Sequence, residues 1–183
     1  KLGCTPEAAC GIIGNIEQES SLRPTIVNYK GATGLCQWLD TRLTGLKNYA
    51  SSKGTNWTDV ATQAEWVIEE LKGKDPTTKS FLQSKEGLTP EQFMQLTDLS
   101  RAVTAFRRCF ERCGEHEAND AKRLKYAQNW YSQIVKKDGG STPPAGGGGG
   151  TPGGGTLPPL EEVSLEPPCD EEAWREIGMK RSE

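Results

Sequence analysis

A carboxyl group at the end of an apolar helix face is the first feature of the sequence that could do chemistry. In the segment 5–20, Ile12, Ile16 and Glu19 fall at positions i, i+4 and i+7, so they share one face of a predicted helix. Partial burial and the negative end of the helix dipole both disfavour a charged carboxylate at that place. Such a glutamate is more often solvated or paired with a cation, but one kept protonated can serve as a general acid.

A loop rich in amide and aromatic side chains follows this helix. The run Gly34-Leu35-Cys36-Gln37-Trp38 begins fifteen residues after Glu19, and Asn28 and Tyr29 precede it. Asn28, Tyr29 and Trp38 have the side chains that hydrogen-bond to and stack on a sugar ring. An aromatic residue in a loop beside helices is about as often a packing anchor. The loop is therefore a candidate glycan contact.

These two segments together resemble one known family. The runs GIIGNIEQESSLRP and GATGLCQWLD are similar to the phage tail lysozyme family, within the lysozyme-like superfamily that includes goose-type lysozymes and lytic transglycosylases. The shared signature is a helix that ends in Glu-Ser, a proline a few residues on, and a Gly-Ala-x-Gly-Leu-x-Gln loop. The later run AFRRCFERCGEHEANDAKRLKYAQNWY resembles the closing pair of helices of the family. The resemblance covers most of residues 3–135 and nothing beyond them.

The resemblance implies a substrate and a set of site residues. The substrate would be the glycan strand of peptidoglycan, cut at the β-1,4 bond after N-acetylmuramic acid, and no cofactor is implied. Glu19 matches the catalytic acid, and Ser20 matches the serine that hydrogen-bonds near it. Gln37 matches the glutamine that lines the glycan groove, and Gly34 and Leu35 match the backbone that lies along the sugar chain.

The sequence leaves open which group stabilises the positive charge that forms on the sugar as the bond breaks. A retaining glycosidase places a second carboxylate about 5–5.5 Å from the acid, and an inverting one about 6.5–9.5 Å away. Asp40 in the loop and Glu111 in a late helix are the candidates, and Tyr131 is a further candidate for reaching the site. A lytic transglycosylase needs no second acid, because the C6 hydroxyl of the muramic acid attacks internally. A non-catalytic glycan-binding module is the main rival, although an intact Glu19 favours an enzyme.

The elements that must position these residues are predicted to be helices. Thr5-Pro6 and Thr89-Pro90 are typical helix starts, and Asp98 is a third candidate cap. Apolar periods also predict helices over 58–71 and 117–136, with a short helical piece near 78–84 and a loop over 28–40. Glu65, Glu69 and Glu70 are expected on a solvated helix face. We therefore expect a mainly α, compact lysozyme-like domain of about six helices, without a strand of convincing length.

The cysteines and the histidine argue against metal chemistry. The six cysteines include no pair of C-x-x-C units, and the chain has a single histidine, His116. No metal site is therefore expected, and catalysis by a Ser-His-Asp or Cys-His set would need an imidazole from elsewhere. We expect the thiols to be small buried apolar groups, or one or two disulfides to form among them.

Composition divides the chain near residue 138. Residues 139–183 contain 11 of the 21 glycines and 7 of the 11 prolines, and carry 3 Lys+Arg against 8 Asp+Glu. We expect a catalytic domain over 1–138, a flexible Gly/Pro-rich linker over 139–160, and an acidic tail over 161–183 that forms one short helix or starts a further domain.

Charge and hydropathy exclude two classes of partner. Residues 1–138 carry 19 Lys+Arg against 17 Asp+Glu, which is too little basic excess for a dedicated nucleic-acid binder. No apolar run is long enough to span a membrane. The chain starts at Lys1, which suggests a segment of a longer wall-acting protein, so the domain is expected to be tethered to another one. The expected location is extracellular, in the cell wall or on a virion.

Overall fold

The computed structural model describes residues 3–113 and 118–137, with the backbone alone at 136 and 137. All of the regular structure in these residues is helical, apart from isolated bridges that join Thr33 to Val27 and to Trp38. The predicted helical fold class is thereby confirmed. The predicted linker 139–160 and acidic tail 161–183 lie outside the described residues.

Nine helical segments are found in the described residues, and two of them, η1 and η2, are single π-helical turns. In chain order they are α1 (Pro6–Ser20), α2 (Asp40–Lys53), α3 (Val60–Glu69), η1 (Glu70–Lys74), α4 (Pro76–Glu86), α5 (Pro90–Met94), α6 (Leu99–Phe106), η2 (Arg107–Glu111) and α7 (Asp120–Lys137).

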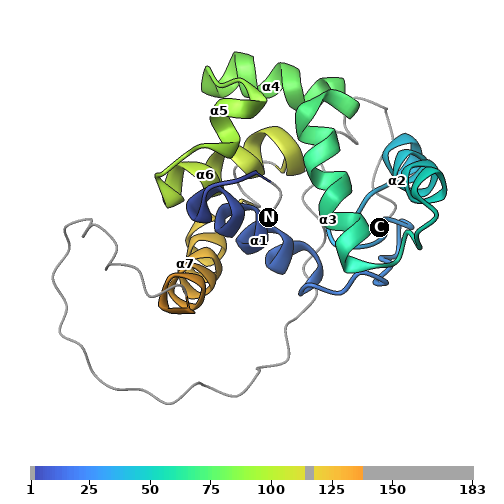
Figure 1. Cartoon of the computed structure of the whole chain (residues 1–183), viewed down its shortest axis with the longest axis horizontal. Coiled ribbons are helices and arrows are strands. Elements are labelled where there is room, and N and C mark those ends of the chain that lie inside the picture. Colours follow the sequence, from blue (N-terminus) through green and yellow to red (C-terminus); the bar gives the residue numbers. More distant parts are fainter. Residues whose placement is uncertain (1–2, 114–117, 138–183) are drawn as a thin grey trace, which may run out of the picture.

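Helix α1 lies at the centre of the fold and packs against α6 and α7 (Figure 1). Its start agrees with the prediction, because the Thr5 hydroxyl accepts a hydrogen bond from the backbone N–H of Ala8 at 3.1 Å and Pro6 follows. The helix ends where Ser21 adopts a left-handed conformation, with φ of 50°. This ending places Glu19 in the last turn, as the apolar period predicts.

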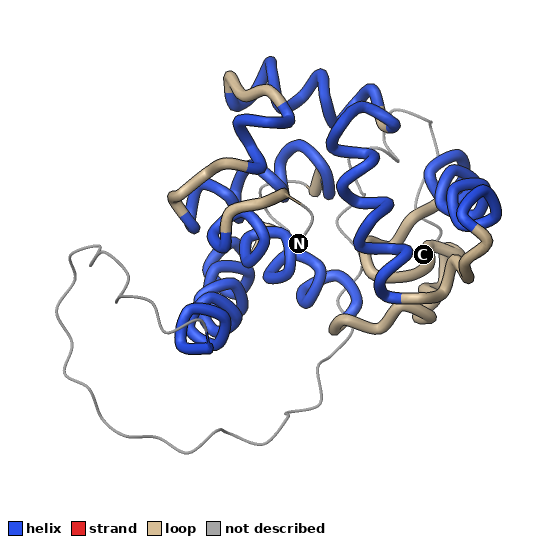
Figure 2. Tube along the Cα trace, viewed as in Figure 1, coloured by secondary structure: helices blue, strands red, loops and turns tan. Residues whose placement is uncertain are grey.

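Helix α2 was not expected from the sequence. Only Leu46 and Ala50 of its fourteen residues are buried, so it has no sustained apolar period to recognise. Figure 2 shows the loop from the end of α1 running to this helix, which stands apart from α1 and packs against α3. The helix that was expected to begin near Asp98 and end near residue 114 is also different, because α6 gives way at Arg107 to the π-helical turn η2.

The core lies between α1 and the later helices. Phe106 stacks on Phe110 with ring centroids 4.4 Å apart, and Phe93 lies 6.2 Å from Phe106. Trp38, Leu46, Leu71 and Leu82 are also almost fully buried. None of the five described cysteines forms a disulfide, and Cys10, Cys36, Cys109 and Cys113 are buried. These four buried thiols agree with the prediction of small apolar groups, and the described cysteines do not agree with the alternative prediction of disulfides.

Candidate functional site

Glu19 lies in the last turn of α1, and a buried arginine meets it there. Its carboxylate Oε1 lies 2.7 Å from Nη2 of Arg123 on α7, and the side chains of Glu19 and Arg123 are 3% and 0% exposed. An apolar setting was expected around this carboxyl group. The structure instead places a buried cation against it.

The guanidinium of Arg123 is held on several sides. Its Nε donates to the carbonyl oxygen of Ala118 at 2.7 Å, and its Nη1 donates to Oδ1 of Asn15 at 3.0 Å. Asn15 is itself fixed, because its Nδ2 donates to the carbonyl oxygens of Gly11 and Val103 at 2.8 and 3.1 Å. A planar guanidinium bound at separate nitrogen atoms has little freedom to rotate. The orientation of Glu19 is therefore set from α7 and from the preceding turn of α1.

Close approach of α7 to α1 makes this contact possible. A Cβ atom added at Gly14 would lie 2.6 Å from the carbonyl oxygen of Arg123 and 2.8 Å from the Cβ of Ala127. Gly11 is as close to Ala102 of α6, where an added Cβ would lie 2.8 Å from the alanine Cβ. Only glycine fits between backbones at this separation, so Gly14 lets α7 approach closely enough for Arg123 to reach Glu19, while Gly11 lets α6 pack against the same helix.

Glu111 is a second buried carboxyl group near Glu19. It is the last residue of η2 and is 8% exposed, and its Oε1 has no hydrogen-bond partner among the described residues. Burial raises the pKa of Glu111 well above its usual value, and the nearby charge of Glu19 raises it further, against the lowering effects of Arg123 and Arg42. Glu111 is therefore a buried carboxyl group that tends to keep its proton, close to the Glu19–Arg123 ion pair.

The loop after α1 is tied to α3 by one buried glutamine. Gln63 is fully buried, and its Oε1 accepts a hydrogen bond from the backbone N–H of Leu35 at 2.9 Å. Its Nε2 donates to the carbonyl oxygens of Pro24 and Trp57 at 2.8 and 3.0 Å. Gly34, with φ of 83°, leaves the room for this side chain, since an added Cβ would lie 2.9 Å from Oε1 of Gln63. No pattern in the sequence indicated this role for Gln63.

Gln37 turns back onto the loop itself. It has φ of 50°, a left-handed conformation that costs energy for a residue with a side chain, and its Nε2 donates to the carbonyl oxygen of Gly34 at 2.9 Å. A non-glycine residue in this conformation at a candidate site is consistent with a functional constraint on the loop.

Trp38 belongs to the core, which corrects its expected place in a sugar groove. Its side chain is 1% exposed, and its indole N–H donates to Oε2 of Glu70 at 2.7 Å. Glu70 is itself 1% exposed and accepts two hydrogen bonds from Arg42, both at 2.9 Å, so its expected place on a solvated helix face was wrong. Glu70 continues α3 in a regular helical conformation, so it lies on the same face as the buried residues Trp66 and Val67.

Four further residues expected to touch substrate are buried: Ser20, Gly34, Leu35 and Gln37. Ser20 is 1% exposed and its hydroxyl donates to the carbonyl oxygen of Ile16 at 3.1 Å, so it supports the helix end. The Leu35 side chain is 3% exposed, and its backbone N–H is taken by Gln63. Neither Ser20 nor Leu35 can bind a sugar in this arrangement without a rearrangement of the loop.

The remaining candidates lie in different places. Tyr29 is exposed on the loop, whereas Oδ1 of Asn28 accepts hydrogen bonds from the backbone N–H groups of Lys30 and Ala32 and so shapes the loop. Asp40 is exposed at the first turn of α2. The hydroxyl of Tyr131 donates to Glu7 at 2.8 Å, in the first turn of α1, about 18 Å along the helix from Glu19. The structure therefore separates Tyr131 from the acid.

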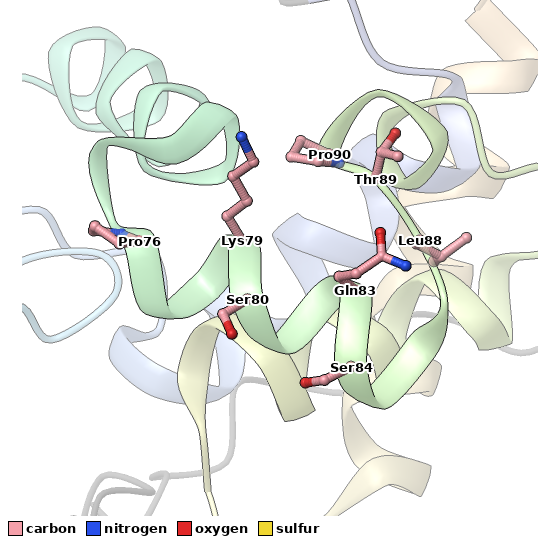
Figure 3. Close-up of a pocket in the computed structure, with 8 residues that line it drawn as sticks. All are labelled: Pro76, Lys79, Ser80, Gln83, Ser84, Leu88, Thr89 and Pro90. Atoms are coloured by element: carbon pink, nitrogen blue, oxygen red, sulfur yellow. The ribbon is translucent and has the colours of Figure 1, made fainter.

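A surface depression of about 460 Å³ lies elsewhere, between α4 and the start of α5 (Figure 3). Its lining includes Lys79, Ser80, Gln83 and Thr89 but no carboxyl group, so it cannot supply an acid for glycan cleavage. Within the described residues, no cluster of His, Cys, Asp or Glu has the composition of a metal site. No helix of this part of the chain is long and apolar enough to cross a membrane.

The chain matches a known protein family. The family model described as phage tail lysozyme matches residues 1–134. The match includes all of the residues that surround Glu19 in the structure. It ends before the Gly/Pro-rich segment begins.

Proposed function

Because the chain belongs to the phage tail lysozyme family, a family of lysozyme-like glycosidases that act on peptidoglycan, we propose that it is a muramidase with Glu19 as the general acid. The bond cut is the β-1,4 bond between N-acetylmuramic acid and N-acetylglucosamine. The observation that carries the proposal is the pair of buried carboxyl groups at the end of α1, one in an ion pair and the other with a raised pKa.

Such a pair suits the cleavage of a glycosidic bond. The leaving sugar oxygen must receive a proton as the bond breaks, and the oxocarbenium-like charge that remains must be stabilised. Two interacting carboxyl groups titrate as a unit, so their proton belongs to the pair and is not fixed on one member. Glu19, which matches the catalytic acid of the family, delivers that proton, and Glu111 is the second carboxyl group.

The presence of Glu111 favours hydrolysis over transglycosylation. A carboxylate on the far side of the sugar ring can activate a water molecule or stabilise the intermediate, whereas internal attack by the muramic C6 hydroxyl requires no second carboxyl group. Glu111 is chosen over Asp40 because the charge of Glu19 acts on its pKa. Asp40 is exposed and lies on α2.

The loop 28–37 is the proposed glycan contact. Tyr29 is 79% exposed and provides an aromatic surface on which a sugar ring can stack. Gly34 and Gln37 shape the loop through the hydrogen bond between them, and Asn28 fixes the turn that presents Tyr29. In this proposal the loop binds the strand and the carboxyl pair cuts it.

Clearing of a suspension of purified cell walls tests the role of Glu19. We expect Glu19→Gln to lower the initial rate by about 10²–10⁴-fold, because the amide keeps the shape of the side chain but cannot donate the acid proton. Glu17→Gln is the matched control, since Glu17 lies on the same helix and accepts a hydrogen bond from the indole of Trp130. Equal clearing by the Glu19→Gln and wild-type proteins would sink the assignment.

Two further results decide the class of activity. Mass spectrometry of the released sugars should show ordinary reducing ends, whereas 1,6-anhydro ends would indicate transglycosylation. If wild-type protein binds walls without clearing them, the glycan-binding module becomes the better description.

The family also bears on location and partners. A phage tail lysozyme is virion-associated, and peptidoglycan is the implied partner. We further propose that the domain acts outside the cell at the wall as a bacteriolytic enzyme, and that it is tethered to another domain of a longer protein.

A further inference from the structure

Arg123 is the buried cation shared by the two carboxyl groups of the site. It forms the ion pair with Glu19 at 2.7 Å, and it is the first of the two arginines whose charge favours the ionised form of Glu111. No motif in the sequence distinguished it from the other basic residues of the last helix. Its own fully buried side chain excludes a role as a surface contact for substrate.

We propose that Arg123 is a positioning residue for cleavage, which fixes the Glu19 carboxylate and supplies the main buried positive charge beside the two carboxyl groups. The inference rests on the proposed function, because it concerns how the same site is prepared for its reaction. Arg123 makes no contact with substrate in this role and acts through Glu19.

The charges around the pair explain why Arg123 matters. Glu111 is influenced by Glu19 from α1, Arg123 from α7, Arg42 from α2 and the thiol of Cys113. The buried thiol of Cys36, in the loop, lies in the field of both glutamates and of Glu70. Arg42 is already bound twice by Glu70, which neutralises most of its charge. Among these described groups Arg123 is therefore the main counter-charge for two carboxyl groups.

Loss of that charge should move the ionisation of the pair towards higher pH. The charge of Arg123 lowers the pKa of Glu111, so its loss should raise that pKa further, and it also leaves the buried Glu19 carboxyl group without its cation. The reaction needs one group protonated and the other ionised. The pH range in which that state is populated, and with it the activity, should shift upward.

The test is the pH profile of wall clearing by the full chain, corrected at each pH for the folded fraction from circular dichroism. We expect Arg123→Gln to move the profile upward by at least about one pH unit, which is a tenfold change in the ionisation equilibrium. Arg123→Lys keeps the positive charge but loses the planar guanidinium that binds several partners at once. It should therefore clear walls more slowly, with the same pH optimum as wild type.

Arg107→Gln is the matched control. Arg107 is another buried arginine, 2% exposed, and its ion pair is with Asp120 at 2.8 Å. Its removal should reduce stability and leave the profile in place. An Arg123→Gln profile that coincides with wild type would overturn the proposal, as would an equal shift in the Arg107 variant.

If Arg123→Gln does not fold, carboxyl ¹³C NMR of the wild-type protein decides. The carboxyl signal that is lost in Glu111→Gln should titrate well above pH 4.5, and its titration should change little in Arg123→Lys, which keeps the charge. A Glu111 signal that titrates near 4.5 in wild type would overturn the proposed role of the site charges. Failure of the proposed function is distinct, because it would appear as undiminished clearing by Glu19→Gln.

Discussion

At the scale of single residues, the site combines two carboxyl groups that the sequence names as candidates with one cation that it does not. Glu19 could be found because it closes an apolar face and matches a family signature. Arg123 could not, since its partner is 104 positions away in the chain and a lone arginine in a helix usually faces solvent. Glu111 was a candidate only by its residue type, and its importance comes from burial, which a sequence pattern does not report.

The raised pKa of Glu111 predicts a pH dependence of stability. Because the folded protein keeps this proton at pH values where the unfolded chain has lost it, folding binds protons, and the free energy of unfolding falls as pH rises above about 4.5. Each pH unit in this window costs up to about 1.4 kcal/mol. Glu111→Gln, which stays neutral, should lack this contribution.

Urea unfolding between pH 4 and pH 8 measures the effect. The stability of wild type minus that of Glu111→Gln should decrease steadily with pH, whereas Glu65→Gln, at a more exposed carboxyl group on α3, should give a nearly constant difference. A constant difference for Glu111→Gln as well would show that Glu111 ionises normally in the folded protein.

At the scale of elements, the spacing between α1 and α7 controls the site. We expect Gly14→Ala to destabilise the fold and to lower the wall-clearing rate of the folded fraction, because the new Cβ would lie 2.6 Å from the carbonyl oxygen of Arg123. Helix propensity alone would predict that Gly14→Ala stabilises the fold, since alanine is favoured over glycine by about 1 kcal/mol within a helix.

Gly45→Ala separates the two effects of that substitution. Its Cβ would meet the ring of Trp66 at 2.7 Å, so it also disturbs a buried contact, but it lies in α2 and not beside Arg123. Thermal unfolding should show a loss of stability for both variants, and the clearing rate per folded molecule should fall only for Gly14→Ala. Equal rates for the two variants would mean that the α1–α7 spacing does not set the geometry of Glu19.

Helices with caps and apolar periods were predictable, and those without them were not. Three helix starts are capped as expected. The side-chain oxygens of Thr5, Thr89 and Asp98 accept hydrogen bonds from the backbone N–H groups of Ala8, Gln92 and Arg101, respectively. Helix α2 escaped prediction because its stability depends on a few buried residues and not on a regular face. The π-helical turns escaped as well, since a one-residue change in hydrogen bonding leaves no mark on the sequence. Glu70 was misplaced although it follows the buried Trp66 and Val67 by four and three residues, which puts it on their face of the helix.

At the scale of the whole molecule, every described contact of the site joins residues of the first 137. The family match also stops at residue 134, and the Gly/Pro-rich segment comes after it. The segment 139–183 has too few apolar residues to build a core and carries an excess of acidic groups. From both observations we expect the folded domain to be independent of residues 139–183.

A chain that ends at residue 138 should therefore be as stable and as active as the full chain. The expected change in thermal unfolding temperature is within about 2 °C, because no buried contact of the described residues is removed. The initial rate of clearing of purified walls should agree within about twofold at equal molar concentration.

Since residues 139–183 carry 3 Lys+Arg against 8 Asp+Glu, their removal also takes away negative charge that would repel an anionic wall. Any gain in rate on truncation should thus disappear at high salt. A loss of activity or of cooperative unfolding on truncation would show instead that the tail completes the domain.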